Sequence, residues 1–87
     1  MLYPNPSKGE FTLRILTPAT VNSTIKITIL NTISQVILSE EIKSNEINYS
    51  EPFIYKNYKL TNLLRGIYLV NVRTDNYIKT GKLIIVD

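Results

Sequence analysis

Apolar side chains in this chain recur at every second position, and this spacing constrains the fold more than any other feature. Two segments show it clearly, residues 10–17 and residues 25–29. Neighbouring side chains of a β-strand point to opposite faces, so the spacing predicts strands that each bury one face. Pro18 ends the first segment, because proline cannot donate a backbone hydrogen bond. The chain shows no apolar pattern at helical spacing, so no helix is expected.

Further strands are expected where similar runs lie between turn-forming residues. The expected segments are 35–42, a short strand at 47–49, one that begins between Phe53 and Tyr58, 67–74 and 77–86. Turns are expected at 31–34, at 60–66, where Gly66 supplies a positive φ, and at 75–76. About seven strands without a helix must cover each other's apolar faces. The pattern therefore predicts an all-β antiparallel sandwich, with Pro18 and Pro52 at sheet edges.

The same alternation predicts which side chains form the core. Tyr68 is expected there with its hydroxyl bonded to the backbone, because a buried tyrosine needs a hydrogen-bond partner. Tyr3 is expected to pack against the edge of the sandwich. One domain is expected, with a turn-rich lead-in over residues 1–9 and the sandwich over 10–87. The expected buried set is Phe11, Leu13, Ile15, Ile25, Ile27, Ile29, Tyr68, Val70 and Val72.

Residue types that support catalysis are sparse. The chain has no cysteine and no histidine, which removes thiol chemistry, the commonest general base and the commonest transition-metal ligand. Glu40 and Glu41 are adjacent, so on a strand they point to opposite faces, and both are expected to be solvated. Asp75 is expected to bond the backbone of its own turn. The serines have no histidine to activate them, so we expect no enzyme activity, no metal and no cofactor.

The net charge of +3 is unevenly distributed. Residues 52–87 carry six basic and two acidic side chains, whereas residues 1–51 carry four basic and five acidic ones. The asymmetry favours an anionic partner for the C-terminal part, although scattered charges are also typical of an ordinary solvated surface. The basic excess is small for a nucleic-acid-binding domain, so no nucleic acid is expected. No apolar run is long enough to cross a bilayer and no signal peptide is visible, so no membrane insertion is expected.

Three stretches of the chain, in order, resemble the type IX secretion C-terminal sorting domain, type A, which ends many exported proteins of the Bacteroidetes. They are YPNPSKGEF at 3–11, LTNLLRGIYLV at 60–70 and TGKLIIV at 80–86. Their order, their spacing and the total length resemble the family over essentially the whole chain. Two positions depart from it: Ser34 stands where the family commonly has glycine, and Asp87 stands where many members end in a basic residue.

The resemblance implies an immunoglobulin-like, seven-stranded β-sandwich that serves as an address on a secreted parent protein. It implies the type IX secretion machinery as partner, namely an outer-membrane translocon and a processing transpeptidase. The implied route is general export into the periplasm and then transfer to the cell surface or medium. A β-sandwich adhesion or carbohydrate-binding module of a surface protein is the alternative function, by analogy of fold alone.

The resemblance also marks candidate sorting-signal residues: Gly66, Tyr68, Lys82 and Leu83, with Arg65 as a neighbouring basic position. Each has a structural explanation beside the functional one. Gly66 fits a turn, and Tyr68 and Leu83 fit the core. Lys82 is the strongest candidate for recognition, because a lysine on a strand contributes little to a core.

Overall fold

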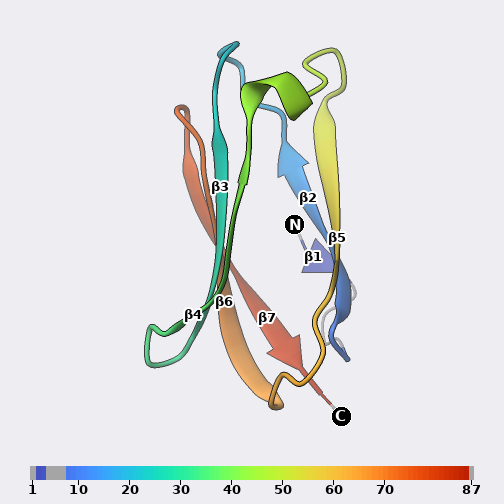
Figure 1. Cartoon of the computed structure of the whole chain (residues 1–87), viewed down its shortest axis with the longest axis vertical. Coiled ribbons are helices and arrows are strands. Elements are labelled where there is room, and N and C mark those ends of the chain that lie inside the picture. Colours follow the sequence, from blue (N-terminus) through green and yellow to red (C-terminus); the bar gives the residue numbers. More distant parts are fainter. Residues whose placement is uncertain (1, 4–7, 87) are drawn as a thin grey trace.

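The computed structural model describes residues 2–3 and 8–86, which form two antiparallel β-sheets packed face to face (Figure 1). One sheet has the strand order β1-β2-β5 and the other β4-β3-β6-β7. The all-β sandwich predicted from the sequence is therefore confirmed. The strands are β1 (Leu2–Tyr3), β2 (Glu10–Leu16), β3 (Ile25–Asn31), β4 (Val36–Ile42), β5 (Phe53–Lys59), β6 (Gly66–Arg73) and β7 (Ile78–Ile85).

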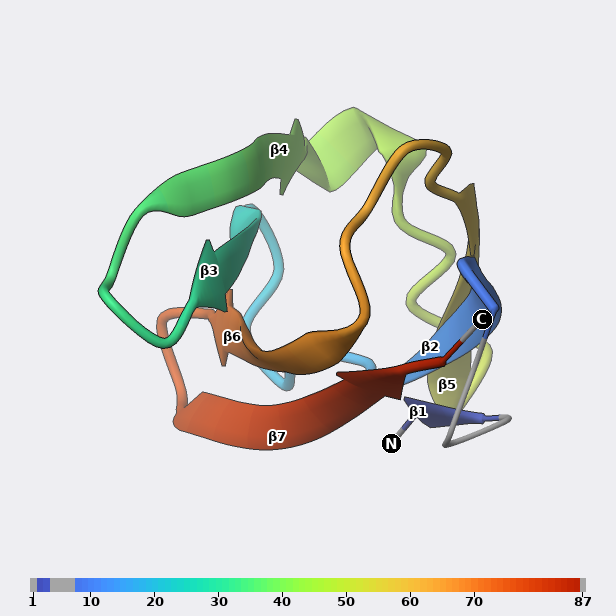
Figure 2. The same ribbon diagram turned by 90° about the horizontal axis from the view of Figure 1, so that it is seen from below.

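The arrangement of the strands is that of an immunoglobulin-like sandwich. β1, β2 and β5 take the places of strands A, B and E, while β4, β3, β6 and β7 take those of C′, C, F and G. Seen from below, the four-stranded sheet is curved, and the three-stranded sheet faces its concave side (Figure 2). The layers bury each other's apolar faces, as a fold without helices requires.

The core lies between the two sheets and contains every side chain predicted to be buried. Ile25, Ile27 and Ile29 on the central strand β3 are 0% exposed. The other predicted members are at most 7% exposed. The side chains that complete the buried apolar cluster are Ile42, Ile47, Tyr58, Leu83 and Ile85.

Polar side chains at the tip of the β6–β7 hairpin bond to the end of β2 and to the segment that follows it. The Tyr77 hydroxyl donates a 2.6 Å hydrogen bond to the Leu16 carbonyl oxygen at the end of β2. Asn76 Oδ1 accepts a hydrogen bond from the Ala19 N–H at 3.1 Å, and its Nδ2 donates to Thr20 Oγ1 at 3.0 Å. These contacts fix the relative position of the two sheets at this end of the sandwich.

The strand predicted at 47–49 is wrong. A single 3₁₀ turn, η1 (Ser44–Glu46), follows β4, and the chain then passes through an irregular segment to β5. Ile47 is still buried, at 8% exposure, where it helps to cover the end of the core. The missed strand is β1, which pairs Leu2 with Leu13 and Tyr3 with Thr12 at the edge of the sheet. Residues 1 and 4–7 of the predicted turn-rich lead-in lie outside the described residues.

The turns follow the expected chemistry with one correction. Ser34 has φ 64° and Gly66 has φ 150°, both in the region that favours glycine. The 75–76 turn is present, but the oxygen that accepts its backbone N–H groups belongs to Thr74 rather than Asp75. Thr74 Oγ1 accepts from the N–H of Asn76 at 3.1 Å and of Tyr77 at 3.2 Å. A buried hydroxyl in this position satisfies two amide donors at once.

Candidate functional site

The candidate residues from the sequence come together at one end of the four-stranded sheet, where β6 begins and β7 ends (Figure 1). Arg65 precedes β6, and Gly66 is its first residue. Tyr68 pairs with Leu83 across the two strands. Lys82, the neighbour of Leu83, pairs with Leu69. The two motifs are thus adjacent in space although sixteen positions separate Gly66 from Lys82.

Tyr68 connects the core to the segment that crosses from one sheet to the other. Its side chain is 7% exposed, and its hydroxyl donates a 2.5 Å hydrogen bond to the Leu64 carbonyl oxygen, four residues upstream. A tyrosine near the start of strand F that bonds back to the upstream backbone is the tyrosine corner of immunoglobulin-like sandwiches. The core position and the backbone partner predicted for Tyr68 are both confirmed.

Gly66 and Leu83 have clear structural roles at the same place. Leu83 is 0% exposed and faces the core beside Tyr68. The φ of 150° at Gly66 lets the crossover segment turn into β6, while a Cβ atom there would meet no other atom within 4 Å. The requirement for glycine is therefore one of backbone conformation and not of space.

Arg65 and Lys82 are the candidates whose side chains reach the surface. Both are exposed. The partner of Lys82 in the sheet, Leu69, is also exposed and lies on the outer face of β6, because Tyr68 and Val70 on either side of it are buried. Lys82 therefore projects from the outer face of the four-stranded sheet.

Sequence reasoning missed the exposed apolar side chains that surround these cations. Ile67 is 45% exposed and Leu69 is 37% exposed, both on the outer face of β6. The signal was present in the sequence, because residues 67–70 form an unbroken apolar run. In a sheet with one buried face, an unbroken run places apolar side chains on the solvent face as well.

A groove of about 260 Å³ opens on the side of the sandwich between β1, β2 and β7. Its apolar lining includes Leu2, Leu13 and Val70. Arg14, Lys79 and the candidate residue Lys82 contribute positive charge, and no described lining residue is acidic.

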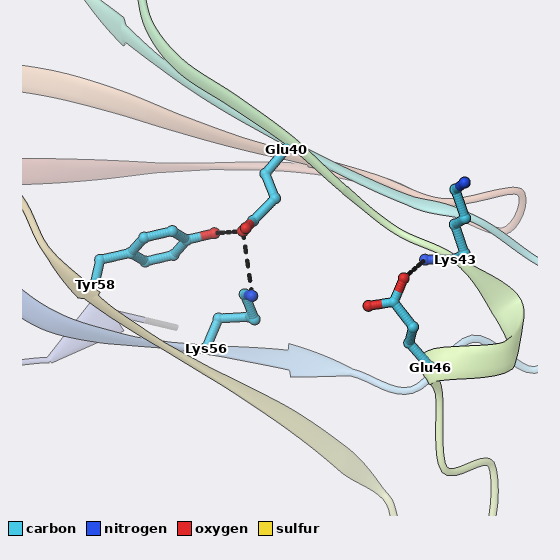
Figure 3. Close-up of polar contacts among 5 residues, drawn as sticks. All are labelled: Glu40, Lys43, Glu46, Lys56 and Tyr58. Atoms are coloured by element: carbon cyan, nitrogen blue, oxygen red, sulfur yellow. Dashed lines mark hydrogen bonds and ion pairs between the residues drawn. The ribbon is translucent and has the colours of Figure 1, made fainter.

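A polar cluster closes the opposite side of the sandwich (Figure 3). Glu40 on β4 accepts a 2.7 Å hydrogen bond from the Tyr58 hydroxyl on β5 and lies 3.3 Å from Lys56 Nζ. Burial raises the pKa of the Tyr58 hydroxyl above its ordinary value of 10.0, and the Glu40 carboxylate raises it further. The expectation that Glu40 is solvated holds only in part. Its side chain is 38% exposed, but it points inward from an edge strand and bridges the two sheets.

The described residues contain neither a cluster of potential metal ligands nor a helix that could span a membrane. Within residues 2–3 and 8–86, no three acidic, histidine or cysteine side chains gather closely enough to hold a metal ion. No helix in the same residues has the length and apolar character to cross a membrane.

Strand order and the tyrosine corner define the class of the chain, a small immunoglobulin-like β-sandwich domain. The family model described as "Secretion system C-terminal sorting domain" matches residues 1–86. The chain belongs to this family of type IX secretion sorting domains. A search of curated proteins and a search of solved structures gave no significant match.

Proposed function

We propose that this domain is a non-enzymatic address that directs a parent protein through the type IX secretion system to the cell surface or the medium. The observation that carries the proposal is the match of the sorting-domain family model to residues 1–86. In this proposal the parent first reaches the periplasm by general export. The folded sandwich is then recognised by the outer-membrane translocon, and a processing transpeptidase acts on the delivered protein.

The exposed candidates, Arg65 and Lys82, are the residues we assign to recognition. Both are exposed cations at the end of the four-stranded sheet where the two motifs meet. Gly66, Tyr68 and Leu83 act indirectly in this proposal, because they hold that end of the sheet in shape.

The test is a reporter protein that carries an export signal at its N-terminus and this domain at its C-terminus. In a host with type IX machinery the reporter should reach the surface or the medium. In the same host without the translocon it should stay in the periplasm. A matched control replaces this domain by an unrelated immunoglobulin-like sandwich of similar size. If the fusion stays in the periplasm of the competent host although the domain is folded, the address is refuted, and the adhesion or carbohydrate-binding alternative takes its place.

A further inference from the structure

The outer face of the four-stranded sheet changes from polar to apolar along its length. Side chains paired across neighbouring strands share a face, so the pairing registers arrange the outward side chains in rows. At one end the rows are Glu41, Lys26, Arg73, Ile78 and then Ser39, Thr28, Asn71, Thr80. At the other end, near the start of β6, the rows are Val36, Leu30, Leu69, Lys82 and then Ile67, Ile84. Polar groups thus predominate in one half of the face, where Ile78 is the exception at 59% exposure, and apolar groups predominate in the other half, where Lys82 is the exception.

We call the apolar half the outer patch, which consists of Val36, Leu30, Leu69, Ile67 and Ile84. Val36 is 59% exposed, Ile67 is 45% exposed and Leu69 is 37% exposed. The solvent face of an antiparallel sheet is normally polar, as the other half of this face is. A contiguous apolar patch on a soluble domain marks a surface that another molecule covers.

The charges around the outer patch identify the chemistry of that molecule. Lys82 completes the row of Val36, Leu30 and Leu69, and Arg65 directly precedes the strand that carries Ile67. The rows of the outer patch contain no carboxylate among the described residues. The outward carboxylate of this sheet, Glu41, pairs with Lys26 at the polar end. A partner complementary to this half presents an apolar surface with carboxylates at its margin.

We infer that the outer patch, together with Lys82 and Arg65, is the surface that a protein component of the type IX machinery covers. This inference rests on the proposed function. It adds that recognition is chiefly apolar, that it takes place on the sheet face, and that the cations orient the partner. Ile67 and Leu69 lie within the motif at 60–70, which agrees with this inference. Tyr68 and Val70 of the same strand face the core, while Ile67 and Leu69 face outward to the partner.

The experiment uses the exported reporter fusion with the double substitution Ile67→Thr and Leu69→Thr. Threonine suits a strand, so the sheet should be retained while the apolar contact is lost. The matched control is Asn71→Thr with Arg73→Thr, on the same strand and the same face but at the polar end. Export of the outer-patch variant should fall at least tenfold at an unchanged melting temperature, and the control should export as the unsubstituted domain does.

Additional variants keep the test decisive if the double substitution unfolds the domain. Leu30→Thr alters the outer patch from the neighbouring strand β3, and Lys82→Glu reverses the charge in its row. Each should reduce export while the domain stays folded. Folded variants that export as the unsubstituted domain does would overturn the inference and leave the proposed address intact. A fusion with the unsubstituted domain that is not exported would refute the address itself, and the inference with it.

Two other occupants of the outer patch are tested with the isolated domain. Sedimentation would detect a second copy, and co-sedimentation with phosphatidylglycerol and phosphatidylethanolamine vesicles would detect a lipid surface. We expect a monomer that does not bind these vesicles. Self-association or vesicle binding that Ile67→Thr with Leu69→Thr abolishes, while export continues, would assign the patch to that other occupant.

Discussion

Tyr58 and Glu40 join the two sheets of the sandwich through a 2.7 Å hydrogen bond from the tyrosine hydroxyl to the carboxylate. Tyr58 belongs to β5, an edge strand of one sheet, and Glu40 to β4, an edge strand of the other. Lys56, two residues before Tyr58 and on the same face, adds its ammonium group 3.3 Å from the same carboxylate (Figure 3). The contact closes one side of the sandwich with a tyrosine ring, which also packs against Phe11 with the ring centroids 5.3 Å apart.

The first prediction concerns this contact. Tyr58→Phe keeps the ring and removes the hydroxyl, so it should lower the free energy of unfolding at pH 7 by about 1.5 kcal/mol, the lower end of the range for a hydrogen bond to a charged group. Glu40 retains Lys56 in this variant, which limits the loss. Urea unfolding of both proteins measures the difference, and equal midpoints at pH 7 would show that the bond contributes nothing.

The second prediction is the pH dependence of the same group. The pKa of Tyr58 is raised in the folded state, first by burial and then by Glu40. The contribution of the neutral Tyr58 hydroxyl to the free energy of unfolding is therefore fully present at pH values below its ordinary pKa of 10.0. It is lost as the pH rises from there toward the higher pKa of the folded state. The stability advantage over Tyr58→Phe should shrink above pH 10, measured by urea unfolding at pH 8, 10 and 11. A constant difference across this range would contradict the assignment.

The third prediction concerns the β3–β4 hairpin. Ser34 occupies a left-handed conformation with φ 64°, which is unfavourable for a residue with a Cβ atom. Ser34→Gly should raise the free energy of unfolding by up to about 1 kcal/mol, because the relief of strain exceeds the added flexibility of the unfolded chain. Ser34→Val is the matched control and should lower the melting temperature. A lower melting temperature for the glycine variant would show that the hydroxyl group matters more than the backbone.

The fourth prediction compares two glycines with positive φ. At Gly66 a Cβ atom meets nothing within 4 Å, so Gly66→Ala should cost about 1–3 kcal/mol from backbone strain alone. At Gly9 a Cβ atom would collide with the carbonyl oxygen of Leu60, whose N–H donates to the Gly9 carbonyl oxygen at 2.9 Å. Gly9→Ala should therefore destabilise the domain more than Gly66→Ala does. Thermal unfolding ranks the two, and the reverse order would refute this account of the lead-in to β2.

The fifth prediction concerns recognition. Lys82→Ala removes an exposed cation and should change the free energy of unfolding by no more than about 0.5 kcal/mol. Export of the reporter fusion should nevertheless fall, and Arg65→Ala added to it should lower export further. Lys26→Ala, at the polar end of the same sheet face, is the control and should export normally. If the folded double variant also exports normally, the two cations are not part of the signal.

The sequence predicted the core well because alternation is a local property of a strand. Residues 25–29 alternate without interruption, and their buried isoleucines follow directly from that pattern. Ile47 and Tyr49 have the same spacing, but two residues cannot distinguish a strand from an irregular segment. Pairing with a neighbouring strand decides that difference. Residues 47–49, which follow the 3₁₀ turn η1, belong to no strand of either sheet.

The features that the sequence did not reveal depend on contacts between distant segments. Strand β1 has only two residues, too few for a pattern, and it is held by pairing with β2, more than eight residues further along the chain. Alternation placed Glu40 and Glu41 on opposite faces correctly. It could not show that the inward face of β4 brings Glu40 within reach of Tyr58, since that depends on how the sheets pack.

The groove beside β7 has a consequence for how copies of this domain behave at high concentration. β7 is an edge strand, and an open edge invites strands of other molecules to pair with it. Lys79 pairs with the buried Val72, so it projects from the inner face of that strand at the mouth of the groove, with its ammonium group 5.8 Å from the centre of the Tyr77 ring. A strand added there would strip water from this charge. An inward-pointing charge on an edge strand therefore disfavours the pairing of β7 with a strand of another copy.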